Sequence, residues 1–258
     1  MKKNSKRRRF LIVLGVIILF IIVFINIPES KKRIATQHFS FVYSSSIDSG
    51  KIAELASNLE NYYSKISQDL KTIPVPIIDV NIYASRWRYI KATKNWSASG
   101  NIEGISKLHF VEQAWGEADS KKVAVHEFTH TIVLKMLLDR EHQPVDSKSF
   151  EAKFAKFPTW LWEATSVYEA EQFKDPKTLP YLSNNSYPDL NELNNRSKGG
   201  KIYDVGYTIV EYILSKYGQD KLIELIINYG NILKTLGITD NEFTKNWYDF
   251  IKEKYLTH

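Results

Sequence analysis

Residues 121–138 read Lys-Lys-Val-Ala-Val-His-Glu-Phe-Thr-His-Thr-Ile-Val-Leu-Lys-Met-Leu-Leu, and the interpretation of the chain starts from them. Apolar residues recur here at helical spacing, which predicts a buried helix from Lys121 to Leu138. The helix contains the pattern His-Glu-x-x-His, with His126 and His130 four positions apart. Four residues make about one turn, so both imidazole rings lie on one face and can reach the same ion.

The glutamate between the histidines indicates a catalytic site. Glu127 is rotated by about 100° from His126 on a helix, so it faces a water on the ion rather than the ion itself. Buried imidazoles and a buried carboxylate are costly without a partner, and Zn²⁺ bound by neutral imidazole nitrogens supplies one. The same five residues also arise by chance on helices whose histidines are solvated or hydrogen-bonded in a core. The surrounding sequence has to supply the rest of the site.

A catalytic zinc ion needs a third protein ligand and an open position. The extended metzincin motif would place glycine at position 133 and histidine at position 136, where this chain has Val133 and Met136. Two downstream carboxylates are alternatives, Glu163 and Glu151. Glu163 is favoured because apolar and aromatic residues surround it, whereas Glu151 lies in a polar, lysine-flanked segment.

The sequence around Glu163 resembles a known family. It reads Trp160-Leu161-Trp162-Glu163-Ala164-Thr165-Ser166-Val167-Tyr168. This run is similar to the third-ligand helix of gluzincin metallopeptidases, specifically the peptidase MA-like domains related to aminopeptidase N. Those domains usually have glycine where Ala164 stands and alanine where Ser166 stands. The resemblance implies zinc ligation by the two histidines together with Glu163, while Trp160 and Trp162 are interpreted as packing residues.

The resemblance extends from about residue 95 to the C-terminus. Tyr203-Asp204-Val205-Gly206 is similar to the Tyr-x-x-Gly opening of a later family helix, whose tyrosine donates a hydrogen bond to the oxyanion. It implies Tyr203 as the oxyanion donor, with Tyr207, one turn further along, as the substitute should the helix be rotated. Leu236-Gly237-Ile238-Thr239, followed by Phe243 and Trp247, looks like the family's C-terminal helical segment.

A strand upstream of the metal helix matches the family less well. Aminopeptidases have Gly-x-Met-Glu-Asn there, whose glutamate holds the free amino group of the substrate, whereas this chain has Gly100-Asn101-Ile102-Glu103-Gly104. Exopeptidase activity is therefore not assigned, and Glu103 is interpreted as a surface residue. We expect residues 104–110 to form the edge strand that pairs with an extended peptide substrate.

The N-terminus predicts a membrane anchor. Residues 1–9 carry six Lys or Arg, and the apolar run from Phe10 to Ile27 is interrupted only by Gly15 and Asn26. At about 1.5 Å per residue this run spans roughly 27 Å, enough for one bilayer crossing. No small-residue cleavage site follows, so an uncleaved transmembrane helix is favoured over a signal peptide. The basic cluster predicts a cytoplasmic N-terminus and an extracellular domain.

Charge and cysteine content exclude other classes of protein. Residues 1–33 have net charge +8 (nine Lys or Arg, one Glu), so the whole-chain charge of +6 leaves −2 for residues 34–258. A nearly neutral domain lacks the basic surface expected for a nucleic-acid partner. The chain has no cysteine, which excludes disulfides, thiol nucleophiles and thiolate metal ligands.

The remaining pattern predicts an α+β fold with a small N-terminal sheet lobe, including an edge strand, and a mainly helical C-terminal lobe. Residues 34–258 suffice for one such domain after the anchor of residues 1–33. The expected strands are His38–Ser44 and Ile77–Tyr83. The expected helices, besides that of the metal motif, are Lys51–Leu70, Arg86–Thr93, Ser149–Lys156, Pro158–Phe173, Tyr203–Tyr217, Gln219–Tyr229 and Asn241–Tyr255. The segment Asp175–Lys201 is expected to be a long ordered loop near the cleft.

Together these expectations describe a membrane-anchored zinc peptidase at the cell surface. Zn²⁺ held by His126, His130 and Glu163 would activate a water, with Glu127 as general base and Tyr203 as oxyanion donor. The expected partners are a peptide or protein substrate and, through the N-terminal helix, the membrane. The alternative is a membrane-tethered peptide-binding module on a catalytically inactive gluzincin scaffold.

Overall fold

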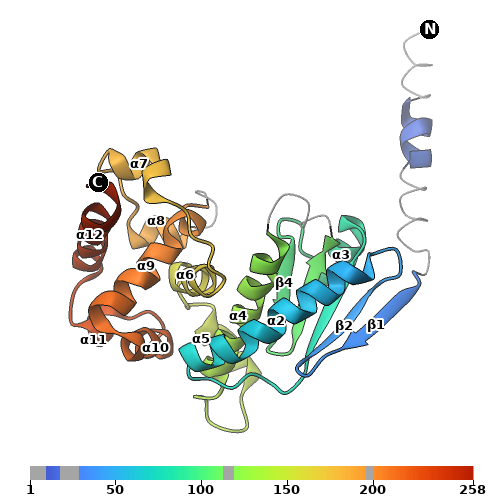
Figure 1. Cartoon of the computed structure of the whole chain (residues 1–258), viewed down its shortest axis with the longest axis horizontal. Helices are drawn as coiled ribbons and strands as arrows, with labels where there is room; N and C mark the ends of the chain where they lie inside the picture. Colours follow the sequence, from blue (N-terminus) through green and yellow to red (C-terminus); the bar gives the residue numbers. More distant parts are fainter. Residues whose placement is uncertain (1–9, 18–28, 113–118, 196–199, 258) are drawn as a thin grey trace.

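The computed structural model of the chain describes residues 10–17, 29–112, 119–195 and 200–257. They form an α+β fold in which a sheet lobe precedes a helical lobe, so this part of the predicted fold class is confirmed (Figure 1). The sheet lobe and the helix that follows it consist of β1 (Lys31–Ala35), β2 (Phe39–Ser44), α2 (Ser49–Asp69), β3 (Ile78–Tyr83), α3 (Arg86–Thr93), β4 (Gly100–Glu103), β5 (Lys107–Val111) and α4 (Ser120–Leu138).

The strands form one mixed sheet in the order β1-β2-β3-β5-β4. β2, β3 and β5 are mutually parallel, whereas β1 and β4 run antiparallel to their neighbours. Within the described residues, β1 and β4 are therefore the edge strands. The edge strand expected over residues 104–110 is instead β5, which lies inside the sheet because it pairs with β3 on one side and β4 on the other.

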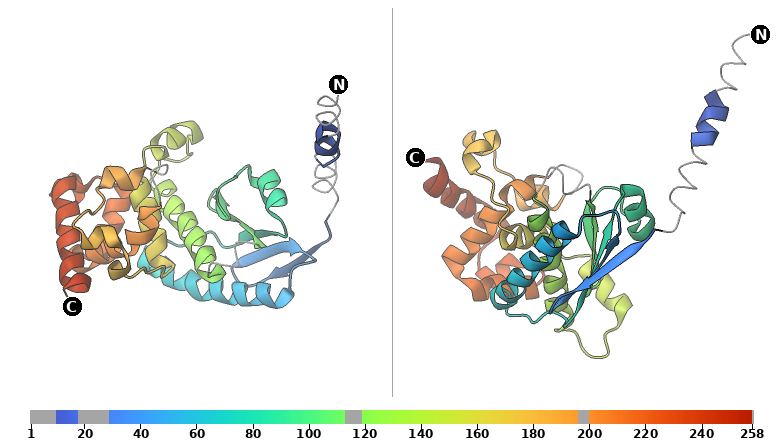
Figure 2. Two further views of the ribbon diagram at one scale, coloured as in Figure 1. Left: turned by 90° about the horizontal axis from the view of Figure 1, so that it is seen from above. Right: turned by 45° about the vertical axis from the view of Figure 1, so that its right-hand side comes forward.

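Helices cover both faces of this sheet (Figure 2). On one face, Phe128 of α4 packs edge to face against Phe39 of β2, with ring centroids 5.3 Å apart. On the other face, Tyr89 of α3 is buried with Val111 and donates its hydroxyl to Asn101 Oδ1 at 2.9 Å. These contacts hold α4 against the core face and α3 against the opposite face, with β4 next to the His-Glu-x-x-His turn.

The helical lobe contains α5 (Ser147–Phe154), α6 (Thr159–Glu169), η2 (Pro176–Thr178), α7 (Pro180–Ser183), α8 (Leu190–Asn194), α9 (Lys201–Tyr217), α10 (Gln219–Ile227), α11 (Ile232–Leu236), α12 (Asp240–Ile251) and η4 (Lys252–Leu256). A Cβ atom at Gly206 of α9 would lie 3.0 Å from Cα of Ala164 in α6, so glycine permits this close helix pairing. On the other side of α9, the indole N–H of Trp247 donates to Thr208 Oγ1 at 3.2 Å. α9 is thus held between α6 and α12.

Several element boundaries differ from those expected. The strands expected over residues 38–44 and 77–83 correspond to β2 and β3. β1, which the sequence analysis did not predict, spans the expected boundary between residues 33 and 34. The segment 175–201, expected to be a loop, contains η2, α7 and α8.

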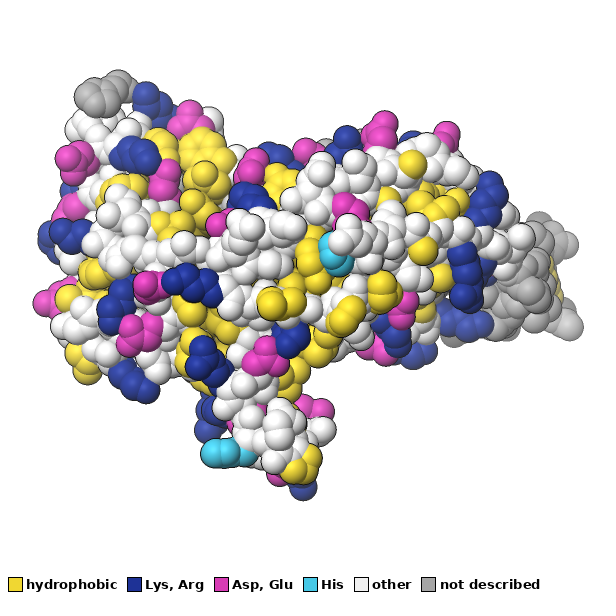
Figure 3. Space-filling view, turned by 60° about the horizontal axis from the view of Figure 1, so that its bottom comes forward, with side chains coloured by type: hydrophobic (Ala, Val, Ile, Leu, Met, Phe, Trp, Pro, Cys, Tyr) yellow, Lys and Arg dark blue, Asp and Glu magenta, His cyan; other side chains and the backbone are white. Residues whose placement is uncertain are grey.

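On the face shown in Figure 3, acidic and basic side chains are interspersed.

The predicted transmembrane helix is contradicted. In the described parts of the chain, no helix is long and apolar enough to cross a membrane. The same finding contradicts the predicted single-pass localisation with an extracellular domain. Residues 18–27 of the apolar run from Phe10 to Ile27 lie outside the described residues.

Candidate metal centre

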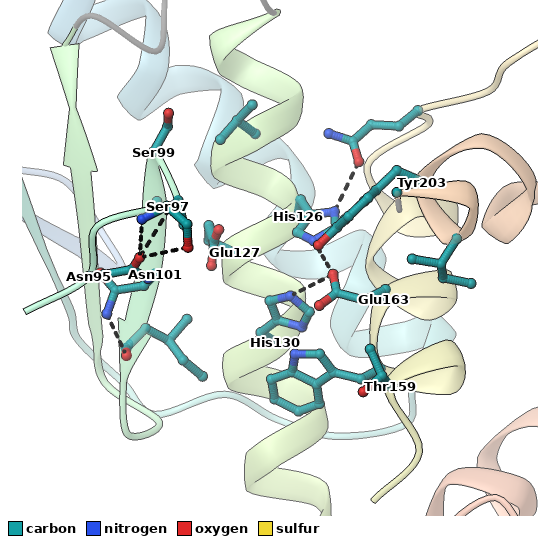
Figure 4. A pocket seen from close by; sticks show the side chains of 18 of the residues that line it. Asn95, Ser97, Ser99, Asn101, His126, Glu127, His130, Thr159, Glu163 and Tyr203 are labelled. Carbon is teal, nitrogen blue, oxygen red and sulfur yellow. Dashed lines mark hydrogen bonds and ion pairs between the residues drawn. The ribbon is translucent and has the colours of Figure 1, made fainter. Parts of the chain in front are cut away.

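Three side chains from two helices converge on one point (Figure 4). α4 supplies His126 and His130, and α6 supplies Glu163. The Nε2 atoms of His126 and His130 lie 3.2 and 3.7 Å from Oε2 of Glu163. All three residues are buried. Among the residues that the structure describes, this is the one group of three potential ligands able to hold a metal ion, with one donor atom of each within 4.8 Å of the others.

The spacing of these atoms fits a tetrahedral ion. Ligand atoms about 2.05 Å from zinc stand about 3.3 Å apart at tetrahedral angles, close to the observed 3.2 and 3.7 Å. All three residues also line a cavity, which leaves room for a fourth, non-protein ligand. Two imidazoles, one carboxylate and an open position form a donor set that suits Zn²⁺.

Hydrogen bonds on the far side of each ring orient the two imidazoles. His126 Nδ1 lies 2.9 Å from Oε1 of Gln172, and His130 Nδ1 lies 2.9 Å from Oγ of Ser166. An amide oxygen only accepts, so Nδ1 of His126 carries a hydrogen, and Nε2 is the ring nitrogen that can offer a lone pair to an ion once it has lost its own proton. A serine hydroxyl can accept in the same way from His130. Such partners fix the tautomer and the direction of a metal-binding histidine.

The negative charge of Glu163 favours a bound cation at this group. Burial raises the pKa of Glu163, but hydrogen bonds from His126 and His130 outweigh burial and hold this pKa well below its usual range. Burial lowers the pKa of His126, yet its hydrogen bond to Glu163 and the nearby negative charges raise it overall. A carboxylate kept anionic between two imidazoles is a ready ligand for a divalent cation.

Glu127 lies beside this group and does not belong to it. Its side chain extends from α4 toward β4, away from Glu163 (Figure 4). Burial raises the pKa of Glu127 to about 7, a rise that His126 opposes and Glu163 supports. β4 makes room for this side chain, because a Cβ atom at Gly100 would lie 2.9 Å from Cγ and 3.0 Å from Oε1 of Glu127. The carboxyl group is thus held at the site with a pKa suited to accepting and returning a proton near neutral pH.

A cavity of about 650 Å³ opens above these residues and is lined by both lobes. This volume lies within the range of ligand-binding cavities. On the sheet side the lining residues are Asn95, Ser97, Ala98, Ser99, Gly100, Asn101 and Ile102. On the helical side they include Thr159, Trp162, Gln172, Leu193, Gly200, Ile202 and Tyr203. A ligand in the cavity would lie between the edge strand β4 and the helices α6 and α9.

The two tyrosines considered as oxyanion donors occupy different places. Tyr203 lines the cavity, is half exposed, and has its ring centroid 6.1 Å from that of His126. Tyr207 packs instead against Tyr168 and Phe173, with centroids 4.9 and 5.2 Å away. The orientation of α9 therefore presents Tyr203 to the site.

The other residues that the sequence brought forward do not belong to the three potential ligands. Glu151 is exposed on α5, so the structure brings Glu163 and not Glu151 to the histidines. Glu103 has a side chain that is 61% exposed and is at the surface, as expected. Trp160 packs in the core against Phe243. Trp162 lines the cavity wall and stacks on the His130 ring, with centroids 4.2 Å apart.

Three residues of the site were missed by the sequence analysis. Ser166 follows Glu163 by three positions on α6, and this spacing was a usable signal that it shares a face with the ligand. Gln172 lies beyond the end of α6, after Glu171 turns the chain with φ 52°, and nothing in the sequence placed it near His126. Gly100 belongs to the site only because β4 approaches α4 so closely that a side chain at this position would meet Glu127, and the sequence does not reveal that approach.

Comparison with models of known protein families found no match, and comparison with curated protein sequences found none either. The resemblance to gluzincins therefore stays a prediction that rests on the quoted motifs.

Proposed function

We propose that this chain is a zinc-dependent peptidase that hydrolyses peptide bonds in a peptide or protein substrate. The observation that carries the proposal is the convergence of His126, His130 and Glu163 on one point, with the non-ligating Glu127 beside them in the same cavity. A structural metal site has no need of such a base. When bound, Zn²⁺ would polarise the scissile carbonyl and lower the pKa of a water molecule to around 7.

The residues of the chain supply the remaining steps. Glu127 accepts the proton of the attacking water and returns it to the leaving amine, which its raised pKa of about 7 supports. Tyr203 donates a hydrogen bond to the carbonyl oxygen as that atom gains negative charge. The outer edge of β4 aligns an extended substrate chain through backbone hydrogen bonds, since β4 is an edge strand within the described sheet.

The proposal is tested with the purified full-length chain and a broad peptide library read by mass spectrometry. We expect cleavage that a zinc chelator abolishes and that added zinc restores. Glu127→Gln should keep zinc and fold, yet lose hydrolysis by about a hundredfold or more. Glu151→Gln, an exposed glutamate outside the site, is the matched control and should cleave like the parent.

Two results would overturn the proposal. Equal cleavage by Glu127→Gln and the parent would assign the activity to another site. Zinc binding without cleavage of any library member, by the parent or by either variant, would instead favour a peptide-binding module on an inactive scaffold.

A further inference from the structure

Two exposed tryptophans pack against each other, and one of them belongs to the loop that lines the cavity. Trp87 of α3 and Trp96 of the loop before β4 are 47% and 67% exposed. Their rings meet edge to face, with centroids 6.2 Å apart. Trp96 lies between Asn95 and Ser97, both of which line the cavity. Large aromatic rings left in water beside a cavity are typical of an interaction surface.

The loop that carries Trp96 is held in place by hydrogen bonds. The guanidinium group of Arg86 donates to the carbonyl oxygen of Trp96 at 2.7 Å and to Ser99 Oγ at 3.5 Å. The side chain of Asn95 accepts the backbone N–H of Ser97 at 3.1 Å. Because the loop is already ordered, a partner that stacks on Trp96 does not have to fix the backbone on binding.

The segment around the two rings is basic. Residues 84–102 contain no Asp or Glu and four basic residues: Arg86, Arg88, Lys91 and Lys94. Arg88 pairs with Glu29 at 3.6 Å, so counting that partner the segment keeps a net charge of 4 − 1 = +3. Lys94, which caps α3, is exposed close in sequence to Trp96. Aromatic faces combined with positive charge complement an acidic chain that also carries aromatic side chains.

We propose that Trp87, Trp96 and Lys94 form a docking surface for an acidic, aromatic-containing segment of the peptide substrate. The inference rests on the proposed peptidase function, because it places this segment beside the bond to be cleaved. A chain lying along β4 passes the loop of residues 95–99 as it leaves the cavity, so the docked segment and the scissile segment belong to one continuous peptide.

The test uses peptides that share one core from the library, a cleaved one if the library experiment yields any and otherwise an arbitrary neutral one. The first peptide is the core alone. The second carries an acidic tail that contains phenylalanine, and in the third lysines replace the acidic residues of that tail. Each tail is added to the N-terminal end in one peptide and to the C-terminal end in another. Binding is measured by fluorescence anisotropy on the full-length chain carrying Glu127→Gln, so that it does not depend on cleavage. Hydrolysis is measured separately on the chain with Glu127 intact.

The double variant Trp87→Ala/Trp96→Ala should bind the acidic-tailed peptide about tenfold more weakly and cleave the core alone at the parental rate. Lys94→Glu should weaken binding of the acidic tail and strengthen binding of the lysine tail. Added salt should weaken only the acidic-tailed complex. Leu233→Ala, an exposed residue of α11 at 63%, is the matched control and should change nothing. Thermal melting checks that each variant is folded.

Unchanged binding of the acidic tail by the folded double variant would overturn the docking surface. An equal loss of affinity for the acidic-tailed and the lysine-tailed peptides in the double variant would overturn the acidic class of partner. Tail-dependent binding without any cleavage would support the docking surface while refuting the peptidase. Cleavage that is indifferent to the tail would support the peptidase while refuting the docking surface.

Discussion

Two clusters of the described residues bring a buried histidine together with a glutamate and a tyrosine. On the sheet, His109 of β5 bonds the hydroxyl of Tyr83 through Nδ1 at 3.0 Å and Glu103 through Nε2 at 3.1 Å. At the metal centre, His126 bonds Gln172 through Nδ1 and Glu163 through Nε2, while Tyr203 lines the same cavity. The residue types are alike, and the histidine rings are buried in both places.

The two clusters differ in whether their ring nitrogens share one partner. At the sheet cluster each ring nitrogen of His109 has its own partner, and Glu103 is mostly exposed and also accepts a hydrogen bond from Lys107. At the metal centre the Nε2 atoms of two rings approach the same oxygen of Glu163, which is buried. Convergence of several acceptors on one point, rather than the presence of histidine and glutamate, is what makes a candidate metal site.

The largest expected effect is loss of the metal on substitution of the buried carboxylate. A site of this kind is expected to hold about one zinc ion per chain. Glu163→Ala should remove this ion, because it leaves two imidazoles that cannot complete the site. Glu103→Ala removes a glutamate that also bonds a histidine, and it should leave the zinc content unchanged. Zinc is measured by elemental analysis of the purified full-length proteins.

Circular dichroism accompanies this measurement, since Glu163 is buried. Glu151→Ala provides a second control for the ligand that the sequence also allowed. Zinc retained by folded Glu163→Ala and lost from Glu151→Ala would invert the assignment of the third ligand.

The next largest effect is a loss of kcat at Tyr203 of the metal centre that is not expected at Tyr83 of the sheet cluster. Tyr203→Phe should lower kcat by about a hundredfold, because one oxyanion donor is worth roughly 3 kcal/mol. Tyr83→Phe removes a hydroxyl that bonds His109 and should leave kcat at the parental value. Steady-state kinetics on a peptide from the library give both numbers. A parental kcat for Tyr203→Phe together with a loss for Tyr207→Phe would show that α9 presents the later tyrosine in solution.

A smaller effect is expected for the hydroxyl that orients His130. Ser166→Ala removes the partner of Nδ1 at 2.9 Å and should weaken zinc affinity by about 10 to 100-fold without abolishing binding. Tyr83→Phe again serves as the control, because it removes the hydroxyl partner of His109, a histidine outside the metal group. Competition titration with a chromogenic chelator measures the affinity. Equal affinity of Ser166→Ala and the parent would leave the hydroxyl a packing role only.

The contrast between the clusters explains which parts of the site the sequence could predict. His126 and His130 were predictable because a helix fixes which residues share a face, and this holds whatever packs around it. Glu163 was predictable because its apolar neighbours indicated a buried helix. The approach of Gln172 and the room left by Gly100 depend on how distant segments meet, and local periodicity carries no such information.

The fold shows the same limit. Apolar alternation and helical spacing predicted β2, β3 and α4, because these patterns are local. The position of β5 between β3 and β4 was missed, since strand order depends on pairing between residues far apart in sequence. The prediction of a transmembrane helix, which rested on a count of apolar residues, is contradicted, since no helix of the described residues is long and apolar enough to cross a membrane.

The smallest expected effect concerns the pH dependence of stability at the sheet cluster. Burial lowers the pKa of His109, and the hydrogen bond to Glu103 opposes this shift without reversing it. Above the unfolded pKa of about 6.5 the ring is neutral in both states and adds no pH dependence. As pH falls toward and through the folded pKa, the unfolded chain binds the proton more readily, so the free energy of unfolding decreases.

His109→Gln keeps a donor and an acceptor but does not titrate, so the difference in unfolding free energy between parent and variant should shrink as pH falls through this window. Urea unfolding at a series of pH values, with both proteins at the same zinc saturation, measures that difference. A difference independent of pH would show that His109 titrates alike in the folded and unfolded chains, and the contrast between the clusters would then rest on geometry alone.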